Sequence, residues 1–350
     1  QQTPPPPDAG PPNAKLQLVN AATSFGPSNP VGALRVCYGV GPSEAQAPIA
    51  TLPPLPDRKS SDAQPFPGVF IGTGGAVQGT GADLTSLAVV PYLMNAQSLA
   101  ERGVLKPDAG VGTTCADLFG SDAGGALTEG VDYWKLPAIP PNTLVKGKSF
   151  ILVLTGCAGD ANITPASKCG DGYTGAGAPG NGNLKVTVYE VDRTTAIDQD
   201  KIGTQFIHAS PAGATALGAG GIQVIPGYIA DKNNPETFKA VSGSGGVDGG
   251  APVAVAGKTD LIQVQGVNVA ADSFIANPSA ANTAFTLQQI QQFSYGANVP
   301  DGGAYRNGAA FTFIAVGDPT EPPLVGEQFN TKVFHFIALP NDPINETYKP

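Results

Sequence analysis

The segment TQFIHASPAG, residues 204–213, has the form of a β-strand that runs into a Ser-Pro turn. A second segment, near the start of the chain, resembles it. QLVNAATS at 17–24 aligns with QFIHASPA at 205–212, so that Asn20 corresponds to His208. The match indicates that the chain contains an internal repeat.

Three further pairs of strand-like segments keep the same order in both halves: LRVCY at 34–38 with IQVIP at 222–226, GKSFILVLTG at 147–156 with GAAFTFIAVG at 308–317, and LKVTVYEVD at 184–192 with FHFIALPND at 334–342. In the second pair, glycines nine residues apart bracket each strand. The segments between the pairs do not match, as expected where strands are constrained and loops vary. We therefore predict two diverged copies of one domain, at 14–196 and 197–350, preceded by a proline-rich extended arm at 1–13.

The alternation of side chains predicts the fold class. Leu184, Val186 and Val188 fall on one face of a strand, and the residues between them are polar. Short strands separated by Gly, Pro, Asn and Asp turns are typical of β-sandwiches. We expect an all-β protein with two tandem immunoglobulin-like β-sandwich domains and long Gly/Pro-rich loops. Short helices are predicted at 91–103, between Pro91 and Gly103, and at 113–120.

Composition narrows the partners and the compartment. Apolar residues make up 41% of the chain and charged residues only 13%, and the net charge is −9. Nucleic acid and anionic membrane both require clustered positive charge, so we expect neither as a partner. The longest apolar run, SFILVLTG, is too short for membrane insertion. A start at Gln1 suits a removed signal peptide, which predicts an extracellular or cell-surface location.

The four cysteines, Cys37, Cys115, Cys157 and Cys169, form no Cys-x-x-Cys pair of the kind found in zinc and redox sites. An even number of cysteines in an exported chain favours disulfides, whereas a cytosolic chain would keep four free thiols. Three pairings are possible, and the sequence does not choose between them. We favour Cys157–Cys169, whose members are close in sequence, which leaves Cys37–Cys115.

The junction VYEVDRTTAIDQDKIGTQFIHASPAG, residues 188–213, resembles the junction between tandem copies of a bacterial exported domain of unknown function. In that family each copy opens on a Val-His-Ala-Ser-Pro-like phrase and closes on a strand that ends in Asp. The resemblance implies a β-sandwich outside the cytoplasm, often at the cell surface. It is specific at 206–211 and weak in the first copy, where VNAAT replaces the phrase. The residues Ala212, Gly213 and Ala214 also depart from the Asp-Ala-Pro that normally follows it.

Neither histidine is predicted to be catalytic. Asn20 stands where the second copy has His208, and the two side chains share the ability to hydrogen-bond backbone at a strand end. A structural turn is therefore favoured at both positions over acid–base chemistry. His335 aligns with Lys185 on the polar face of a strand, so we expect it to face solvent.

Motifs for catalysis and ligand binding are weak. There is no Gly-x-Ser-x-Gly elbow, and no dinucleotide or phosphate loop is complete. Asp171, Asn181 and Asn183 offer oxygens that could hold calcium, although a flexible surface loop is the favoured interpretation and no cofactor is expected. A saccharide site would need exposed aromatic residues, whereas Trp134 is expected in the core, with the adjacent Tyr133 on the other face.

These features favour a non-catalytic exported structural or adhesive protein, a self-assembling subunit of a cell-surface layer or appendage. The partner would be the chain itself, through the arm or through sheet edges. A module that binds carbohydrate or another surface ligand is the alternative. A secreted hydrolase with two facing carboxylates is the third reading.

Overall fold

The computed structural model describes residues 14–22, 34–42, 68–69, 77–78, 83–102, 118–119, 127–159, 166–175, 182–213, 225–231, 234–240, 255–265, 273–276, 284–287, 289–290, 294, 305, 307–320 and 334–341. These residues are mostly β-strands, and the longest helix among them is α1 (Ala96–Glu101). The prediction of an all-β fold is confirmed. The predicted arm at 1–13 lies outside the described residues, and the domain boundaries and the immunoglobulin-like assignment stay predictions.

Two sheets have β1 and β9 at their centres. The β1 sheet contains β1 (Lys15–Asn20), β3 (Gly68–Val69), β4 (Val77–Gln78), β7 (Ser149–Thr155) and β8 (Lys185–Val191). The β9 sheet contains β9 (Lys201–His208), β12 (Ile262–Gln265), β15 (Ala310–Val316) and β16 (His335–Pro340). Both contain one parallel pair, β1 with β7 and β9 with β15, and then an antiparallel strand, β8 or β16.

The two sheets also have the same register. Asn20 pairs with Leu154, and His208 pairs with Ala315. The sequence repeat aligns Asn20 with His208 and Leu154 with Ala315, so equivalent residues occupy equivalent positions. The next strand continues the correspondence, because Leu154 pairs with Val186 where Ala315 pairs with Phe336. Three of the four aligned segments therefore have the same strand pairing in both halves.

The glycines that bracket β7 and β15 have a conformational reason. Gly147 and Gly156 have φ angles of 75° and 97°, and Gly308 and Gly317, at the aligned positions, have 79° and 83°. These values lie in the left-handed region, which side chains with a Cβ rarely adopt. Each strand is thus entered and left through a backbone conformation that favours glycine, and the spacing of nine residues is preserved in both copies.

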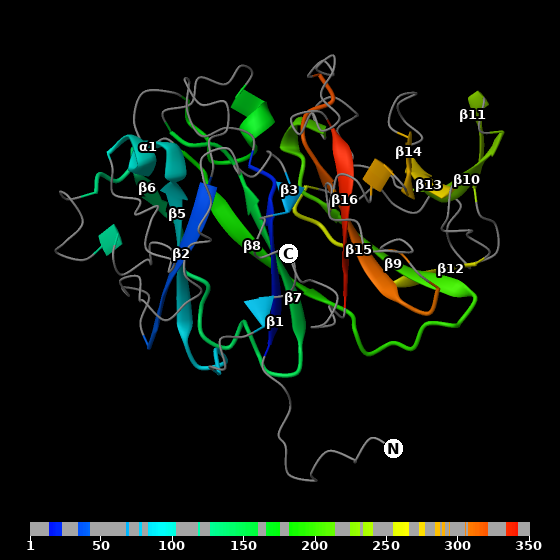
Figure 1. Ribbon diagram of the computed structural model, residues 1–350, viewed down its shortest axis with the longest axis horizontal. Coiled ribbons are helices and arrows are strands. Elements are labelled where there is room, and N and C mark those ends of the chain that lie inside the picture. The colour runs from blue at the N-terminus through cyan, green and yellow to red at the C-terminus, as the bar shows by residue number, and fades with distance from the viewer. Residues whose placement is uncertain are drawn as a thin grey trace, which may run out of the picture.

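The described residues form two more sheets. The β2 sheet contains β2 (Leu34–Gly41), β5 (Ala88–Asn95) and β6 (Tyr133–Lys135). The β10 sheet contains β10 (Ile225–Asp231), β11 (Asn234–Ala240), β13 (Ser273–Ala276) and β14 (Ala284–Thr286). Figure 1 shows the four sheets following one another along the long axis, in the order β2, β1, β9, β10.

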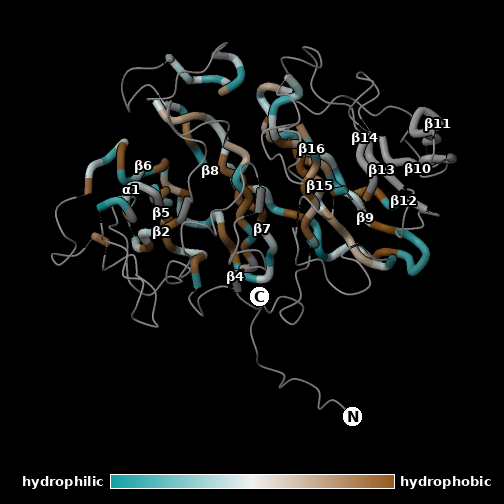
Figure 2. Tube along the Cα trace, turned by 45° about the horizontal axis from the view of Figure 1, so that its top comes forward, coloured by the Kyte–Doolittle hydropathy of each residue, from teal (hydrophilic) through white to brown (hydrophobic). Residues whose placement is uncertain are grey.

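Apolar side chains fill the spaces between the sheets. One core joins the β2 sheet to the β1 sheet and includes Val89, Leu93, Phe150 and Leu152. Trp134 belongs to this core and is 7% exposed, which confirms its predicted burial. A second core lies on one face of the β9 sheet and includes Phe206, Phe313 and Phe336. Figure 2 shows hydrophobic residues concentrated along β7 and β15, in the middle of the molecule.

A third core joins the two halves of the chain face to face. It contains Val19, Ile151, Val153 and Tyr189 from the β1 sheet and Ile207, Ile314, Val316 and Ile337 from the β9 sheet, among others. Both of these sheets are therefore covered on both faces. This explains why β7 and β15 read as nearly continuous apolar runs and not as half-buried alternating strands.

Two local predictions are wrong. Residues 91–95 belong to β5, and the helix begins only at Ala96. Asn95 provides the N-terminal cap of this helix, because the Asn95 Oδ1 accepts a hydrogen bond from the Ser98 amide at 3.2 Å. His335 was expected to face solvent, but it is 1% exposed. The alternation of β16 could not show that a second sheet covers its outer face. The predicted helix at 113–120 is described only at 118–119, where the residues are helical.

Candidate functional site

The phrase that repeats in the sequence forms the same turn in both halves. The Asn20 Oδ1 accepts a hydrogen bond from the Ala22 amide at 3.2 Å. The His208 Nδ1 accepts one from the Ser210 amide, also at 3.2 Å. In each case a buried side chain at the end of the strand bonds the backbone two residues ahead, which bends the chain away from the sheet.

The Ser-Pro part of the phrase caps a short helical turn at 211–213. The Ser210 Oγ accepts a hydrogen bond from the Gly213 amide at 2.8 Å, and it donates one to the Gly317 carbonyl. Pro211 follows at the first helical position, where a missing N–H costs nothing. Gly213 is required by packing, since a Cβ there would lie 2.6 Å from the Ser210 Oγ. The hydroxyl is thus engaged with backbone on both sides.

The imidazole of His208 is neutral. It is 1% exposed, and burial lowers the pKa of His208 from its ordinary value to about 4. Because Nδ1 accepts a hydrogen bond, the proton lies on Nε2, for which the described part of the chain provides no hydrogen-bond partner. The Asn20 Nδ2 is likewise buried with no partner among the described residues. The Ser210 amide, and not its hydroxyl, contacts the imidazole, so the pair lacks the contact through which a histidine activates a serine.

The Cys157–Cys169 disulfide is present, with Cα atoms 5.4 Å apart. It closes the loop of residues 157–169. We call the longer segment 157–183, which contains this loop and ends at Asn183, the disulfide loop; residues 157–159, 166–175 and 182–183 of it are described. Cys37 is also disulfide-bonded. Cys115, its predicted partner, lies outside the described residues.

Asn183 holds the two sides of the disulfide loop together. Its Oδ1 accepts a hydrogen bond from the Cys157 amide at 2.8 Å. Its Nδ2 donates to the carbonyls of Cys169 and Asp171, at 2.8 and 3.0 Å. Gly156 lets Asn183 approach, because a Cβ on Gly156 would lie 2.5 Å from the Asn183 carbonyl oxygen.

These contacts involve two of the residues that the sequence marked as possible calcium ligands, Asp171 and Asn183. The Asp171 carbonyl accepts a hydrogen bond from the Asn183 Nδ2, and the Asn183 side-chain oxygen accepts one from the Cys157 amide. Asn181, the other predicted ligand, lies outside the described residues. Within the described part of the chain, no three His, Cys, Asp or Glu side chains gather in a way that could hold a metal ion.

A polar network crosses between the two halves beside the third core. The Gln205 Oε1, on β9, accepts hydrogen bonds from the Asp192 amide at 3.0 Å and the Asn341 Nδ2 at 2.8 Å. The Gln17 Nε2, on β1, donates to the Pro340 carbonyl at 2.7 Å. Gln17 and Gln205 are equivalent in the repeat, and each bonds backbone at the end of the outer strand of the other half. The contact between the halves is therefore reciprocal.

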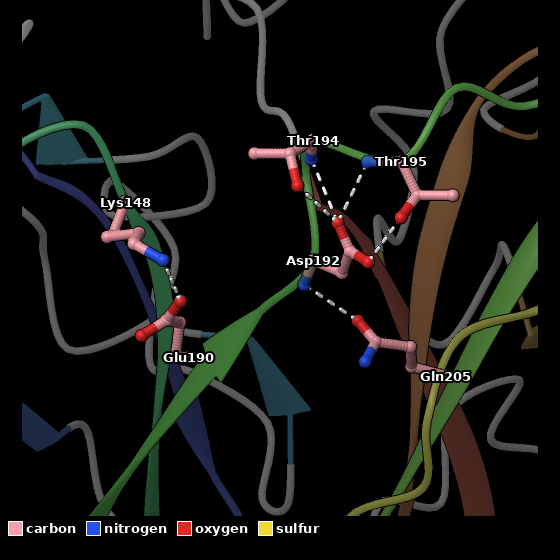
Figure 3. A network of polar contacts seen from close by, with 6 residues as sticks. All are labelled: Lys148, Glu190, Asp192, Thr194, Thr195 and Gln205. Atoms are coloured by element: carbon pink, nitrogen blue, oxygen red, sulfur yellow. Dashed lines mark hydrogen bonds and ion pairs between the residues drawn. The ribbon is translucent and has the colours of Figure 1, made fainter.

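Figure 3 shows how this network meets the link between β8 and β9. Asp192, at the end of β8, accepts hydrogen bonds from the amides of Thr194 and Thr195, at 2.9 and 3.0 Å. Hydrogen bonds, led by that from the Thr195 hydroxyl, lower the pKa of Asp192 to about 2. The Asp192 carboxylate thus fixes the first turn of the link, and the Asp192 backbone amide donates a hydrogen bond to the Gln205 Oε1.

The sequence did not single out Gln17 or Gln205, and it marked Asn183 only as a possible calcium ligand, not as the residue that holds the loop together. A signal for the glutamines was present, since the same polar residue recurs at one position of an otherwise apolar strand in both copies. Such a residue is best explained by a buried hydrogen bond. No comparable signal marks this role of Asn183, because its partners are backbone groups 12 to 26 residues earlier in the chain.

An aromatic cluster lies on the face of the β2 sheet opposite the first core, with Tyr92 buried and Phe119 and Tyr133 half-buried. Tyr92, Phe119 and Tyr133 contact one another with ring centroids 5.2 to 6.1 Å apart. The Lys135 ammonium lies 6.0 Å from the centroid of the Tyr92 ring. Burial, followed by the charge of Glu129, raises the pKa of Tyr133. The cluster thus combines aromatic rings, phenol hydroxyls and charged groups.

No helix in the described part of the chain is both long and apolar enough to cross a membrane. No protein-family model matches the sequence, and no curated protein matches it.

Proposed function

We propose that the chain is a non-catalytic, exported bacterial structural protein that assembles with copies of itself in a cell-surface layer or appendage. The observation that carries the proposal is the reciprocal face-to-face packing of the two halves. This packing uses the broad faces of the β1 and β9 sheets inside one chain. Sheet edges and loops are therefore the parts of the chain that remain available for contact with a neighbouring chain.

The repeated phrase supports a structural role. His208 and Ser210 resemble acid–base and nucleophilic groups in type, but the His208 Nδ1 and the Ser210 Oγ bond backbone on this turn. The resemblance of the 188–213 junction to exported tandem domains supports export and an immunoglobulin-like sandwich in each half. The Cys157–Cys169 disulfide is compatible with an oxidising location outside the cytoplasm.

The edge strand β8 is the proposed point of assembly. Among the described strands, β8 pairs on one side only, with β7. Its Lys185 and Glu190 are exposed and Thr187 is half-buried. A strand from a neighbouring chain could extend the β1 sheet there by main-chain hydrogen bonds.

Light scattering and electron microscopy of the full chain test the proposal. We expect concentration-dependent polymers that Thr187→Lys weakens, because charge on an edge strand opposes strand addition. Ser86→Lys, in an exposed turn of the same half, is the matched control and should assemble like the parent. A full-length protein that stays monomeric at high concentration contradicts self-assembly. Assembly that is unchanged in Thr187→Lys and lost on deletion of 1–13 assigns the contact to the arm.

A second candidate function rests on the aromatic cluster. Rings beside phenol and charged groups are what saccharide-binding surfaces present, and the cluster supports a carbohydrate-binding module. A glycan array with the parent and Tyr133→Ala tests this candidate. Binding that Tyr133→Ala removes would favour the module over the structural protein, and no binding to any glycan would count against it.

A further inference from the structure

The disulfide loop belongs to the first half of the chain, yet it contacts the second half at two places. The Lys168 Nζ lies 2.6 Å from the Asp318 Oδ2 and 2.9 Å from the Thr320 Oγ1. Gly170 lies against Pro211, since a Cβ on Gly170 would be 3.2 Å from the Pro211 Cγ. Both contacts fall at the end of the β9 sheet where β9 and β15 terminate.

The groups that receive the loop are themselves ordered. The Asp318 side chain is 4% exposed, and its Oδ1 accepts hydrogen bonds from the Thr320 amide at 2.8 Å and the Thr320 hydroxyl at 2.7 Å. The Asp318 carbonyl accepts a hydrogen bond from the Phe334 amide at 3.1 Å, at the start of β16. Pro211 stands on the helical turn that Ser210 caps. The disulfide loop therefore contacts residues that hydrogen bonds within the second half already hold in place.

The disulfide controls where Lys168 lies. Lys168 precedes Cys169 in the 3-10 helix η2 (Ala166–Cys169), and the bond to Cys157 ties this helix to the end of β7. Asn183 adds hydrogen bonds from the first residue of the loop to its turn. A lysine on a free loop would lose much side-chain and backbone freedom on pairing with Asp318, whereas a lysine on a cross-linked turn loses less.

We propose that the disulfide loop is a latch that fastens the first half of the chain to the second. The cross-link positions Lys168 and Gly170, and the second half receives them at Asp318 and Pro211. The cysteines thus stabilise contacts between the halves as well as the loop that they close. This role goes beyond the proposed function and holds whether or not the chain assembles.

The test measures amide hydrogen exchange in the full chain by NMR. Cys157→Ala/Cys169→Ala removes the cross-link within the first half. Thr320 and Phe334 report on the second half, and we expect their amides to exchange about tenfold faster in the variant, as for loss of one charge-assisted contact. The Asn183 amide, bonded to the Cys157 carbonyl at 3.1 Å, reports on the loop itself.

Faster exchange at Asn183 with unchanged rates at Thr320 and Phe334 would overturn the proposal, because the disulfide would then stabilise its own loop alone. If the double variant fails to fold or loosens throughout, Lys168→Met decides. It keeps the disulfide and should speed exchange at both reporters while leaving Asn183 unchanged. Unchanged reporters in Lys168→Met also overturn the latch. Lys146→Met, which breaks an exposed ion pair with Asp83, is the matched control and should leave both reporters unaffected.

Discussion

The buried His208 should make the fold sensitive to mild acid, and His208→Asn should remove that sensitivity. Burial lowers the pKa of His208 from about 6.5 to about 4 in the folded chain. Between these values the unfolded chain binds a proton that the folded chain does not. Stability therefore falls as pH drops from about 6.5 to about 4, and the loss from this group ends below about 4.

The magnitude follows from the size of the shift. About 2.5 pKa units correspond to roughly 3 kcal/mol between pH 7 and pH 4. His208→Asn should fold with stability near that of the parent at pH 7, because Asn20 already makes the equivalent hydrogen bond in the first half. At pH 4.5 the variant should be more stable than the parent by about 2–3 kcal/mol.

Thermal and urea unfolding at pH 7.5, 6.5, 5.5 and 4.5 measure the difference. Only the difference between parent and variant is interpreted, so His335 and the carboxylates cancel. Asp192, whose pKa is lowered to about 2, loses its contribution only as pH falls below about 4, outside this window. Unfolding midpoints of parent and variant that run parallel across the series would refute the reasoning. His208→Leu is the second comparison and should cost about 1–3 kcal/mol at pH 7, because the Ser210 amide loses its partner.

Three further predictions, which involve five substitutions, have definite expected outcomes in urea unfolding. Gln205→Ala should cost about 2–3 kcal/mol and Gln17→Ala only about 1 kcal/mol, because the Gln205 Oε1 accepts two hydrogen bonds, one from Asp192 across the halves and one from Asn341 within its own half, and the Gln17 Nε2 donates one. Equal costs would contradict the network. Gly156→Ala should cost more than about 3 kcal/mol from strain and a clash, whereas Gly175→Ala, with φ of 112° and nothing within 4 Å of a Cβ, should cost about 1–2 kcal/mol. Asp132→Ala should cost about 3–5 kcal/mol, because the buried carboxylate pairs with an arginine and caps a turn, and a loss below about 1 kcal/mol would show that the pair is solvated.

The part of the fold that the sequence predicts is the part that repeats. Aligning Asn20 with His208 placed β1 and β9 in equivalent sheets, and the glycine brackets marked β7 and β15, because the backbone there accepts few residues. The helix at 91–103 was misplaced because Pro91 and Gly103 resemble helix ends, while buried neighbours on both sides keep 88–95 extended. The alternation of side chains also gave a wrong prediction for His335. It shows which residues share a face of the strand, but not whether another sheet covers that face.

The sites divide in the same way. The disulfide between Cys157 and Cys169 followed from their short separation and from chemistry, and the turn at His208 from the comparison with Asn20. Asn183 and Lys168 act on partners that are far away in sequence, Cys157 and Asp318, through backbone and surface groups. Spacing along the chain carries no information on such contacts. Folding of the disulfide loop brings Asn183 to Cys157, and packing of the halves brings Lys168 to Asp318.

The difference between the two copies of the phrase now has a physical account. Both copies need the side chain at Asn20 or His208, because both strands must end in a bonded turn. Only the second copy continues with Ser210 and Pro211, and only the first carries the disulfide loop that lies against Pro211. On the latch proposal these two departures from the repeat are complementary, since one half supplies the loop and the other the capped turn that receives it. On this proposal, VNAAT matches the Ser-Pro phrase weakly because the two segments have different neighbours. The second copy of the phrase receives the disulfide loop at Pro211, and the first copy has no equivalent contact to make.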